Sequence, residues 1–157
     1  MIRATIVGFI VWFSIASATA AVSKVEQDVI DFARAEKESA ITLLEQVVNI
    51  NSGTMNHAGV TRVADIFAEE FKALGFNTNW YDMSEVDRAG HLFAEKQGDG
   101  QCLLLIGHLD TVFESDSPFQ KFSRDGDFAR GPGVNDMKGG DVVILYALKA
   151  LKAAGAL

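Results

Sequence analysis

The sequence contains almost no cysteine and no cluster of basic residues. Cys102 is the only cysteine among 157 residues, which excludes an internal disulfide and leaves a packed core to hold the fold. Aspartate and glutamate (21) outnumber lysine and arginine (14), and the formal net charge is −7. An acidic chain without a basic run is a poor partner for nucleic acid or an anionic membrane, so neither is expected.

The sequence has no apolar run long enough for a membrane span, and its amino terminus is instead typical of export. Arg3 precedes a largely apolar, uncharged run over residues 4–15, and Ala18-Thr19-Ala20 has the small side chains that signal peptidases read. We predict a signal peptide over residues 1–20 and a periplasmic or secreted mature protein without a stable membrane span. The alternative is an uncleaved anchor, but a bilayer span needs about 20 apolar residues.

Helical spacing of hydrophobic residues predicts four helices, over residues 23–34, 38–49, 58–74 and 140–154. The third has the clearest stripe, which we interpret as core packing, and Gly75 ends it. In the fourth helix the residues expected to be buried are Val143, Ile144, Ala147, Leu148 and Leu151.

Short strands are predicted between the third and fourth helices. Residues 76–81 form one, residues 91–96 and 101–107 are expected to pair across an Asp99-Gly100 turn, and residues 121–124 and 127–130 form a second hairpin. The apolar run 103–107 predicts a buried strand, and Cys102, at its start, is predicted to be a small core residue. This order of elements predicts an α/β architecture. Because the chain stops directly after a helix, where a further strand is expected, we interpret residues 21–157 as the N-terminal part of a larger domain.

Two polar segments carry the candidate chemistry. His108 and Asp110 follow the apolar run, and residues two apart in an extended segment point the same way. A neutral imidazole is a good zinc ligand, and a nearby carboxylate can fix its tautomer. The glycine-rich segment 131–140 adds Asp136, whose carboxylate can bridge two metal ions or, alternatively, cap the last helix.

The two segments together resemble the di-zinc exopeptidase and amidohydrolase family. Gly-His-Leu-Asp-Thr-Val and Gly-Pro-Gly-Val-Asn-Asp-Met-Lys-Gly-Gly occur in that family's order and spacing, and the similarity extends to the segment 47–54. The family includes acetylornithine deacetylase, succinyl-diaminopimelate desuccinylase and aminoacylase; the chain is most similar to its secreted glutamate carboxypeptidases. The resemblance implies a mixed sheet flanked by helices, of which this chain holds an incomplete part without the lid or dimerisation domain.

The resemblance also implies roles for individual residues. His108 would bind one zinc ion, Asp136 would bridge both, and Asp110 would serve catalysis by orienting His108 and tuning the metal. A cis peptide is implied between Asp136 and Met137. The implied reaction is zinc-dependent hydrolysis of an amide in a small peptide or N-acyl amino acid, with C-terminal glutamate as one candidate.

The general-base glutamate, the remaining metal ligands and the dimerising domain of that family have no counterpart in these 157 residues. We therefore expect the chain by itself to be inactive and a homodimer only for a full-length protein. The alternative function is that of a non-catalytic remnant or binding fragment. We expect His57 and His91 to be solvated or structural, Lys138 to be a structural cation, and Glu69-Glu70 to be solvated surface.

Overall fold

The computed structural model describes residues 21–157, and the predicted signal peptide lies outside them. The elements are, in chain order, α1 (Lys24–Ala35), α2 (Lys37–Val48), α3 (His57–Ala73), β1 (Asn77–Met83), the 3-10 helix η1 (Ser84–Val86), β2 (Arg88–Glu95), β3 (Ser123–Asp125), β4 (Phe128–Arg130) and α4 (Lys138–Ala153). The four predicted helices are confirmed to within two residues at each end. Among the described residues, no helix combines the length and hydropathy that crossing a membrane requires.

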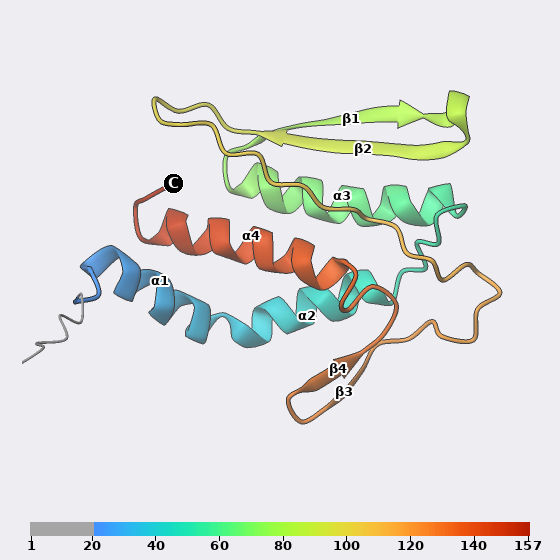
Figure 1. The fold of residues 1–157 in the computed structure, drawn as a ribbon, viewed down its shortest axis with the longest axis horizontal. Coiled ribbons are helices and arrows are strands. Elements are labelled where there is room, and N and C mark those ends of the chain that lie inside the picture. The colour runs from blue at the N-terminus through green and yellow to red at the C-terminus, as the bar shows by residue number, and fades with distance from the viewer. Residues whose placement is uncertain (1–20) are drawn as a thin grey trace, which may run out of the picture.

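Three helices supply the core. Figure 1 shows α4 between the α1–α2 pair and α3. The fully buried side chains of Val47, Phe67 and Leu145 come from α2, α3 and α4 respectively and belong to one hydrophobic cluster. Local capping defines two of the helix starts: Ser23 and Glu26 form a capping box on α1, and the side chain of Asn56 accepts a hydrogen bond from an amide of α3.

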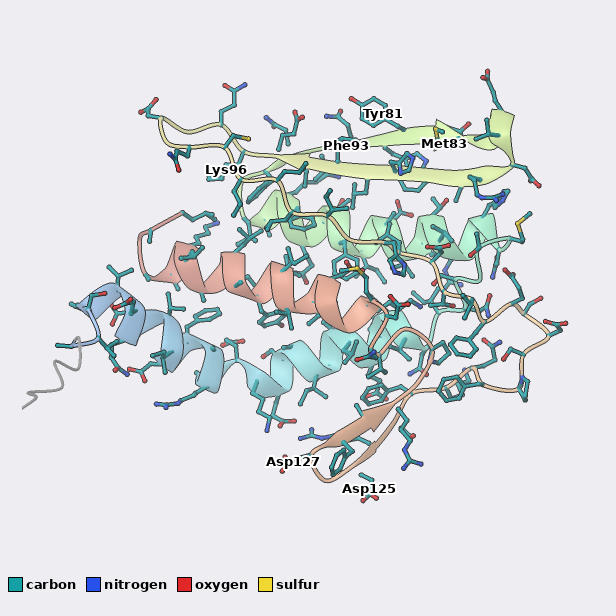
Figure 2. The ribbon with its side chains drawn as sticks, viewed as in Figure 1. Tyr81, Met83, Phe93, Lys96, Asp125 and Asp127 are labelled. Carbon is teal, nitrogen blue, oxygen red and sulfur yellow. The ribbon has the colours of Figure 1, made fainter. Side chains whose placement is uncertain are left out.

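Strand β1 pairs antiparallel with β2, and this hairpin packs on α3. The alternation of exposed and half-buried residues places Leu92 against the core. Figure 2 shows Tyr81 on the side of the hairpin away from α3, where its ring meets Phe93 edge-on at 5.0 Å. The second hairpin, β3–β4, forms where it was predicted, with Asp125 and Asp127 near its tip. Helices with two small antiparallel sheets confirm the predicted class, an incomplete α/β domain.

The predicted pairing of residues 91–96 with residues 101–107 is wrong. Strand β2 takes β1 as its partner instead, and within residues 21–157 the segment 101–110 has no ladder with any strand. Its hydrophobic side chains are consequently exposed rather than buried: Leu104 is 75% and Ile106 is 76% accessible. Cys102 is exposed as well, so its predicted place in the core is also wrong. An apolar run predicts a buried strand only where neighbouring strands exist to cover it.

The predicted buried face of α4 is correct only in part: Ile144, Leu148 and Leu151 are half-buried, and Val143 and Ala147 are exposed. Val142 and Leu145 are buried, whereas Val143 is 68% accessible. Hydrophobic residues occur on almost every side of this helix, so their spacing alone did not select a face. The buried side also includes Lys138 and Asp141, which a hydrophobic pattern cannot identify.

Candidate metal centre

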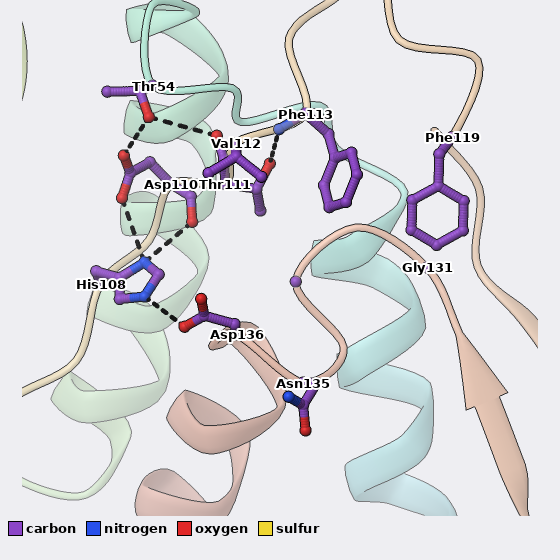
Figure 3. Close-up of a pocket in the computed structure, with 11 residues that line it drawn as sticks. Thr54, His108, Asp110, Thr111, Val112, Phe113, Phe119, Gly131, Asn135 and Asp136 are labelled. Atoms are coloured by element: carbon purple, nitrogen blue, oxygen red, sulfur yellow. Dashed lines mark hydrogen bonds and ion pairs between the residues drawn. The ribbon is translucent and has the colours of Figure 1, made fainter.

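His108 and Asp136 face each other across the gap between the two motif segments. The imidazole Nε2 of His108 lies 2.9 Å from Oδ1 of Asp136, and Nδ1 lies 3.1 Å from the backbone oxygen of Asp110 and 3.3 Å from its Oδ1. Figure 3 shows the imidazole between the two carboxylates. The structure therefore brings together all three residues that the sequence pointed to, with Asp110 on one side of the ring and Asp136 on the other.

The loop after α2 holds the His108 segment in place. The amide of Thr111 donates to the carbonyl of Ser52 (2.8 Å), and the amide of Thr54 donates to the carbonyl of Thr111 (3.1 Å). These bonds form a short parallel bridge between Gly53 and Thr111. The buried hydroxyl of Ser52 adds a hydrogen bond to the carbonyl of Leu109 (2.9 Å). Segments about 60 residues apart in the sequence are thus joined directly beside the candidate site.

Lys138 anchors the segment that carries Asp136. This side chain is fully buried at the start of α4, and its ammonium donates to the carbonyls of Val47 (2.8 Å) and Ile50 (2.9 Å) at the end of α2. A cation is favourable there because the last carbonyls of a helix carry partial negative charge and lack intrahelical donors. Lys138 is therefore structural, as predicted.

The turn into α4 leaves the carboxylate of Asp136 directed at His108. Gly133 has a left-handed φ of 79°, and a Cβ there would lie 3.0 Å from both Thr111 and Lys138 side-chain atoms. The N-cap of α4 is Met137, without a side-chain hydrogen bond, so Asp136 does not take the alternative role of helix cap. The peptide between Asp136 and Met137 is cis, as the family resemblance implies.

The site opens into a cavity of about 390 Å³. Its polar wall includes His108, Asp110 and Asp136, and Phe113 and Phe119 stand opposite with their rings 5.0 Å apart. A cavity with an apolar wall and a few convergent polar groups is the usual form of a small-molecule site.

The electrostatics of the site favour a cation. Burial by itself lowers the pKa of His108, but the hydrogen bonds and charges of Asp136 and Asp110 outweigh burial and raise that pKa above its usual value. Two carboxylates thus stabilise positive charge at this ring, whether the charge is a proton or a metal ion.

The donor atoms lie close enough to share one zinc ion. Two ligands of a tetrahedral zinc, each about 2.0–2.2 Å from it, lie about 3.4 Å apart, so His108 Nε2 and Asp136 Oδ1, at 2.9 Å, would need to separate slightly to hold it. Zinc ordinarily takes at least three protein ligands. Residues 21–157 contain no group of three or more histidine, cysteine or acidic side chains placed to hold a metal ion. His108 and Asp136 therefore supply fewer ligands than a zinc ion ordinarily takes.

Asp141 lies behind the site with an incomplete set of hydrogen bonds. The residue is 8% accessible, its Oδ2 has no hydrogen-bond partner among the described residues, and a Cβ added to Gly107 would clash with its Oδ1. Burial raises the pKa of Asp141 to about 7, although the positive charges of His108 and Lys138 act in the opposite direction.

We expect Asp141→Asn to stabilise the chain at alkaline pH. Since the folded carboxyl keeps its proton up to about pH 7 and the unfolded one ionises near pH 4, the folded chain binds more protons in this window, and wild-type stability falls as pH rises. The asparagine variant lacks this loss. Its advantage in free energy of unfolding, as measured by urea unfolding, should grow by about 4 kcal/mol between pH 4 and pH 8, since each of about three pKa units is worth about 1.4 kcal/mol. If the stability difference between Asp141→Asn and wild type does not change with pH, the pKa of Asp141 is not raised by burial.

The other polar residues singled out in the sequence lie apart from this centre. His57 lies 3.8 Å from Asp87, His91 is exposed on β2, and neither joins His108 in a metal-ligand group among the described residues. Glu69 is exposed and pairs with Lys72, as expected. Glu70 is half-buried and pairs with Lys149 of α4 at 2.7 Å, so the expectation of a fully solvated Glu-Glu pair holds only for Glu69.

Sequence reasoning missed two polar residues beside the site. The hydroxyl of Thr54 donates to Oδ2 of Asp110 at 2.6 Å, and Asp141 is the buried acid described above. The segment containing Thr54 was part of the family resemblance, which was the available signal for this contact. Nothing in the sequence distinguished Asp141 from an exposed acid in the first turn of a helix.

Sequence comparisons relate this chain to a peptidase family and to two known proteins. Residues 104–157 match the model of peptidase family M20/M25/M40. Over 98% of its length the chain is 31% identical to carboxypeptidase G2 of Pseudomonas sp. (strain RS-16). Over 71% of its length it is 27% identical to a protein of Pyrococcus abyssi (strain GE5 / Orsay) named as a LysW-lysine/LysW-ornithine hydrolase.

The chain spans 38% of the length of carboxypeptidase G2 and 29% of the length of the Pyrococcus protein. The match to the family model contains both His108 and Asp136, and the match to carboxypeptidase G2 extends over nearly all of the chain. Sequence motifs, site geometry and both kinds of similarity agree, and they relate the chain to peptidase family M20/M25/M40, whose model residues 104–157 match, and to carboxypeptidase G2.

Proposed function

We propose that this chain provides one half of the two-zinc centre of an exported, carboxypeptidase-type amidohydrolase. The observation that carries the proposal is the 2.9 Å approach of His108 Nε2 to Asp136 Oδ1, with Asp110 behind the opposite ring nitrogen. His108 would hold one zinc ion, Asp136 would contact both, and Asp110 would keep the imidazole in the tautomer that leaves Nε2 free. Bound zinc would polarise the scissile carbonyl and acidify a water molecule.

The proposed substrate is a small peptide or N-acyl amino acid with a free carboxylate, and C-terminal glutamate is the first candidate. The similarity to carboxypeptidase G2 supports this class. The cavity beside His108 has room for a small side group against Phe113 and Phe119. Export is proposed from residues 1–20, which lie outside the described residues; a secreted product beginning at Ala21 in amino-terminal sequencing would support it, and one beginning at Met1 would contradict it. A homodimer is proposed only for a full-length protein that contains the dimerisation domain of the family.

The test is thermal unfolding of the purified chain with increasing zinc. Because zinc binds the folded site, a concentration 100 times the dissociation constant should stabilise the chain by about 2.7 kcal/mol, and a chelator should reverse the effect. Magnesium should do less, since it prefers all-oxygen ligands. A midpoint unaffected by zinc would contradict the proposal.

An assay of hydrolysis tests whether the chain holds only half of the site. The described residues provide two ligands and no identified general base, so the 157-residue chain with zinc should not release glutamate from an N-acyl glutamate. Zinc-dependent release by the chain alone would overturn the view that it holds only half of the site.

A further inference from the structure

The hydroxyl of Thr54 ends a line of polar contacts that runs through the candidate metal centre. Thr54 Oγ1 donates to Asp110 Oδ2 (2.6 Å), Asp110 Oδ1 lies 3.3 Å from Nδ1 of His108, and Nε2 of that ring lies 2.9 Å from Asp136 (Figure 3). The carbonyl of Thr111 is a second acceptor for the same hydroxyl, but at 3.4 Å it is much farther away. A hydroxyl has one hydrogen to donate, and the shorter, charge-assisted bond to the carboxylate is the stronger one.

The position of this hydroxyl is set by the backbone around it. The amide of Thr54 donates to the carbonyl of Thr111, and Gly53 forms the parallel bridge with the same residue. Met55 contributes a further amide bond to the carboxylate of Glu114 (3.0 Å). Because hydrogen bonds hold the backbone on both sides of Thr54, the position of its Oγ1 is fixed.

Asp110 needs such a partner because its side chain is not held by burial. About a third of it is accessible, and the terminal torsion of an aspartate is broad and only roughly two-fold. A donor on Oδ2 selects the rotamer in which Oδ1 faces Nδ1 of His108. With a zinc ion on Nε2, the ring would carry its proton on Nδ1, where the backbone carbonyl of Asp110 at 3.1 Å and its Oδ1 at 3.3 Å both accept it.

We propose that Thr54 is a positioning residue of the metal centre: by fixing the carboxylate of Asp110, its hydroxyl fixes the tautomer and orientation of His108 and thereby strengthens zinc binding. This inference rests on the proposed function, since it assigns a role to Thr54 within that same site. Thr54 itself is not a metal ligand. Its effect passes through two other side chains.

The test compares Thr54→Val with Thr54→Ser in the untagged chain. Valine keeps the shape of threonine and lacks the donor, whereas serine keeps the hydroxyl. Zinc affinity is measured by competition with a chromophoric chelator. It should fall roughly tenfold in Thr54→Val, which is the smaller effect expected when a residue that hydrogen-bonds a metal ligand is lost. In Thr54→Ser the affinity should be nearly that of wild type.

Val63→Ala is the control for a purely structural role. It removes two methyl groups from a fully buried position on α3, outside the loop that carries Thr54. Its thermal midpoint should fall while its zinc affinity stays near the wild-type value. If Val63→Ala weakens zinc binding as much as Thr54→Val, or if Thr54→Val binds zinc as wild type does, the positioning role is wrong.

A second measurement separates failure of this inference from failure of the proposed function. Nitrogen-15 spectra of the metal-free chain at alkaline pH report how the proton of the neutral His108 ring divides between Nδ1, beside Asp110, and Nε2, beside Asp136. The Nδ1–H share should be smaller in Thr54→Val than in wild type. If wild type and His108→Ala bind zinc equally, the proposed function fails, and the tautomer alone decides for or against Thr54. An unchanged tautomer in Thr54→Val would overturn the inference.

Discussion

Replacing Lys138 with methionine is expected to lower the free energy of unfolding by about 3 kcal/mol. Methionine fills a similar volume, so the loss comes mainly from two buried carbonyls, those of Val47 and Ile50, that no longer receive a charged donor. The buried Asp141 also loses a nearby positive charge, which raises the cost of its ionised form. Urea unfolding followed by circular dichroism measures the change.

Lys149→Met is the matched control on the same helix. The ammonium of Lys149 pairs with Glu70 at 2.7 Å, but both side chains are partly accessible, at 23% and 32%. Removing such a pair should cost less than about 1 kcal/mol. Equal losses of unfolding free energy in the two variants would show that the hydrogen bonds of Lys138 to the end of α2 stabilise the chain no more than a partly exposed ion pair does.

Replacing His108 with alanine is expected to weaken zinc binding by about a hundredfold, compared with about tenfold for Thr54→Val. Among the described residues His108 provides the only imidazole of the centre, and without it Asp136 is left as a largely exposed carboxylate. Isothermal titration with zinc measures the affinity. Asp136→Asn should produce a loss of similar size, because an amide oxygen is a much poorer ligand than a carboxylate.

His91→Ala provides the control for nonspecific binding of zinc to surface histidines. His91 is exposed on β2 and belongs to no metal-ligand group in the described part of the chain. Its variant should bind zinc as wild type does. If His91→Ala weakens binding and His108→Ala does not, the zinc site lies elsewhere on the surface.

The sequence predicted the helices and the site more accurately than the pairing of the strands. Helices depend on local spacing and caps, as at Ser23 and Asn56, and these can be read along the chain. Strand partners depend on what lies next to a segment in space. Strand β2 could pair with a segment before or after it, and the structure selects β1.

The burial of the chain could be predicted only in part. Residues 103–106 are as apolar as a core strand, yet they are exposed because no strand in the described part of the chain lies beside them. Conversely, Lys138 and Asp141 are buried although their residue types favour the surface. Their burial depends on the end of α2 and on Gly107, which are distant in the sequence.

The most direct test of a zinc centre at His108 and Asp136 is anomalous diffraction at the zinc edge from crystals of the zinc-loaded chain. We predict a peak about 2.0–2.2 Å from Nε2 of His108 and at a similar distance from a carboxylate oxygen of Asp136. Asp110 should remain on Nδ1 of the same ring. Zinc peaks only at other sites, such as His57 or His91, with none between His108 and Asp136, would contradict the account.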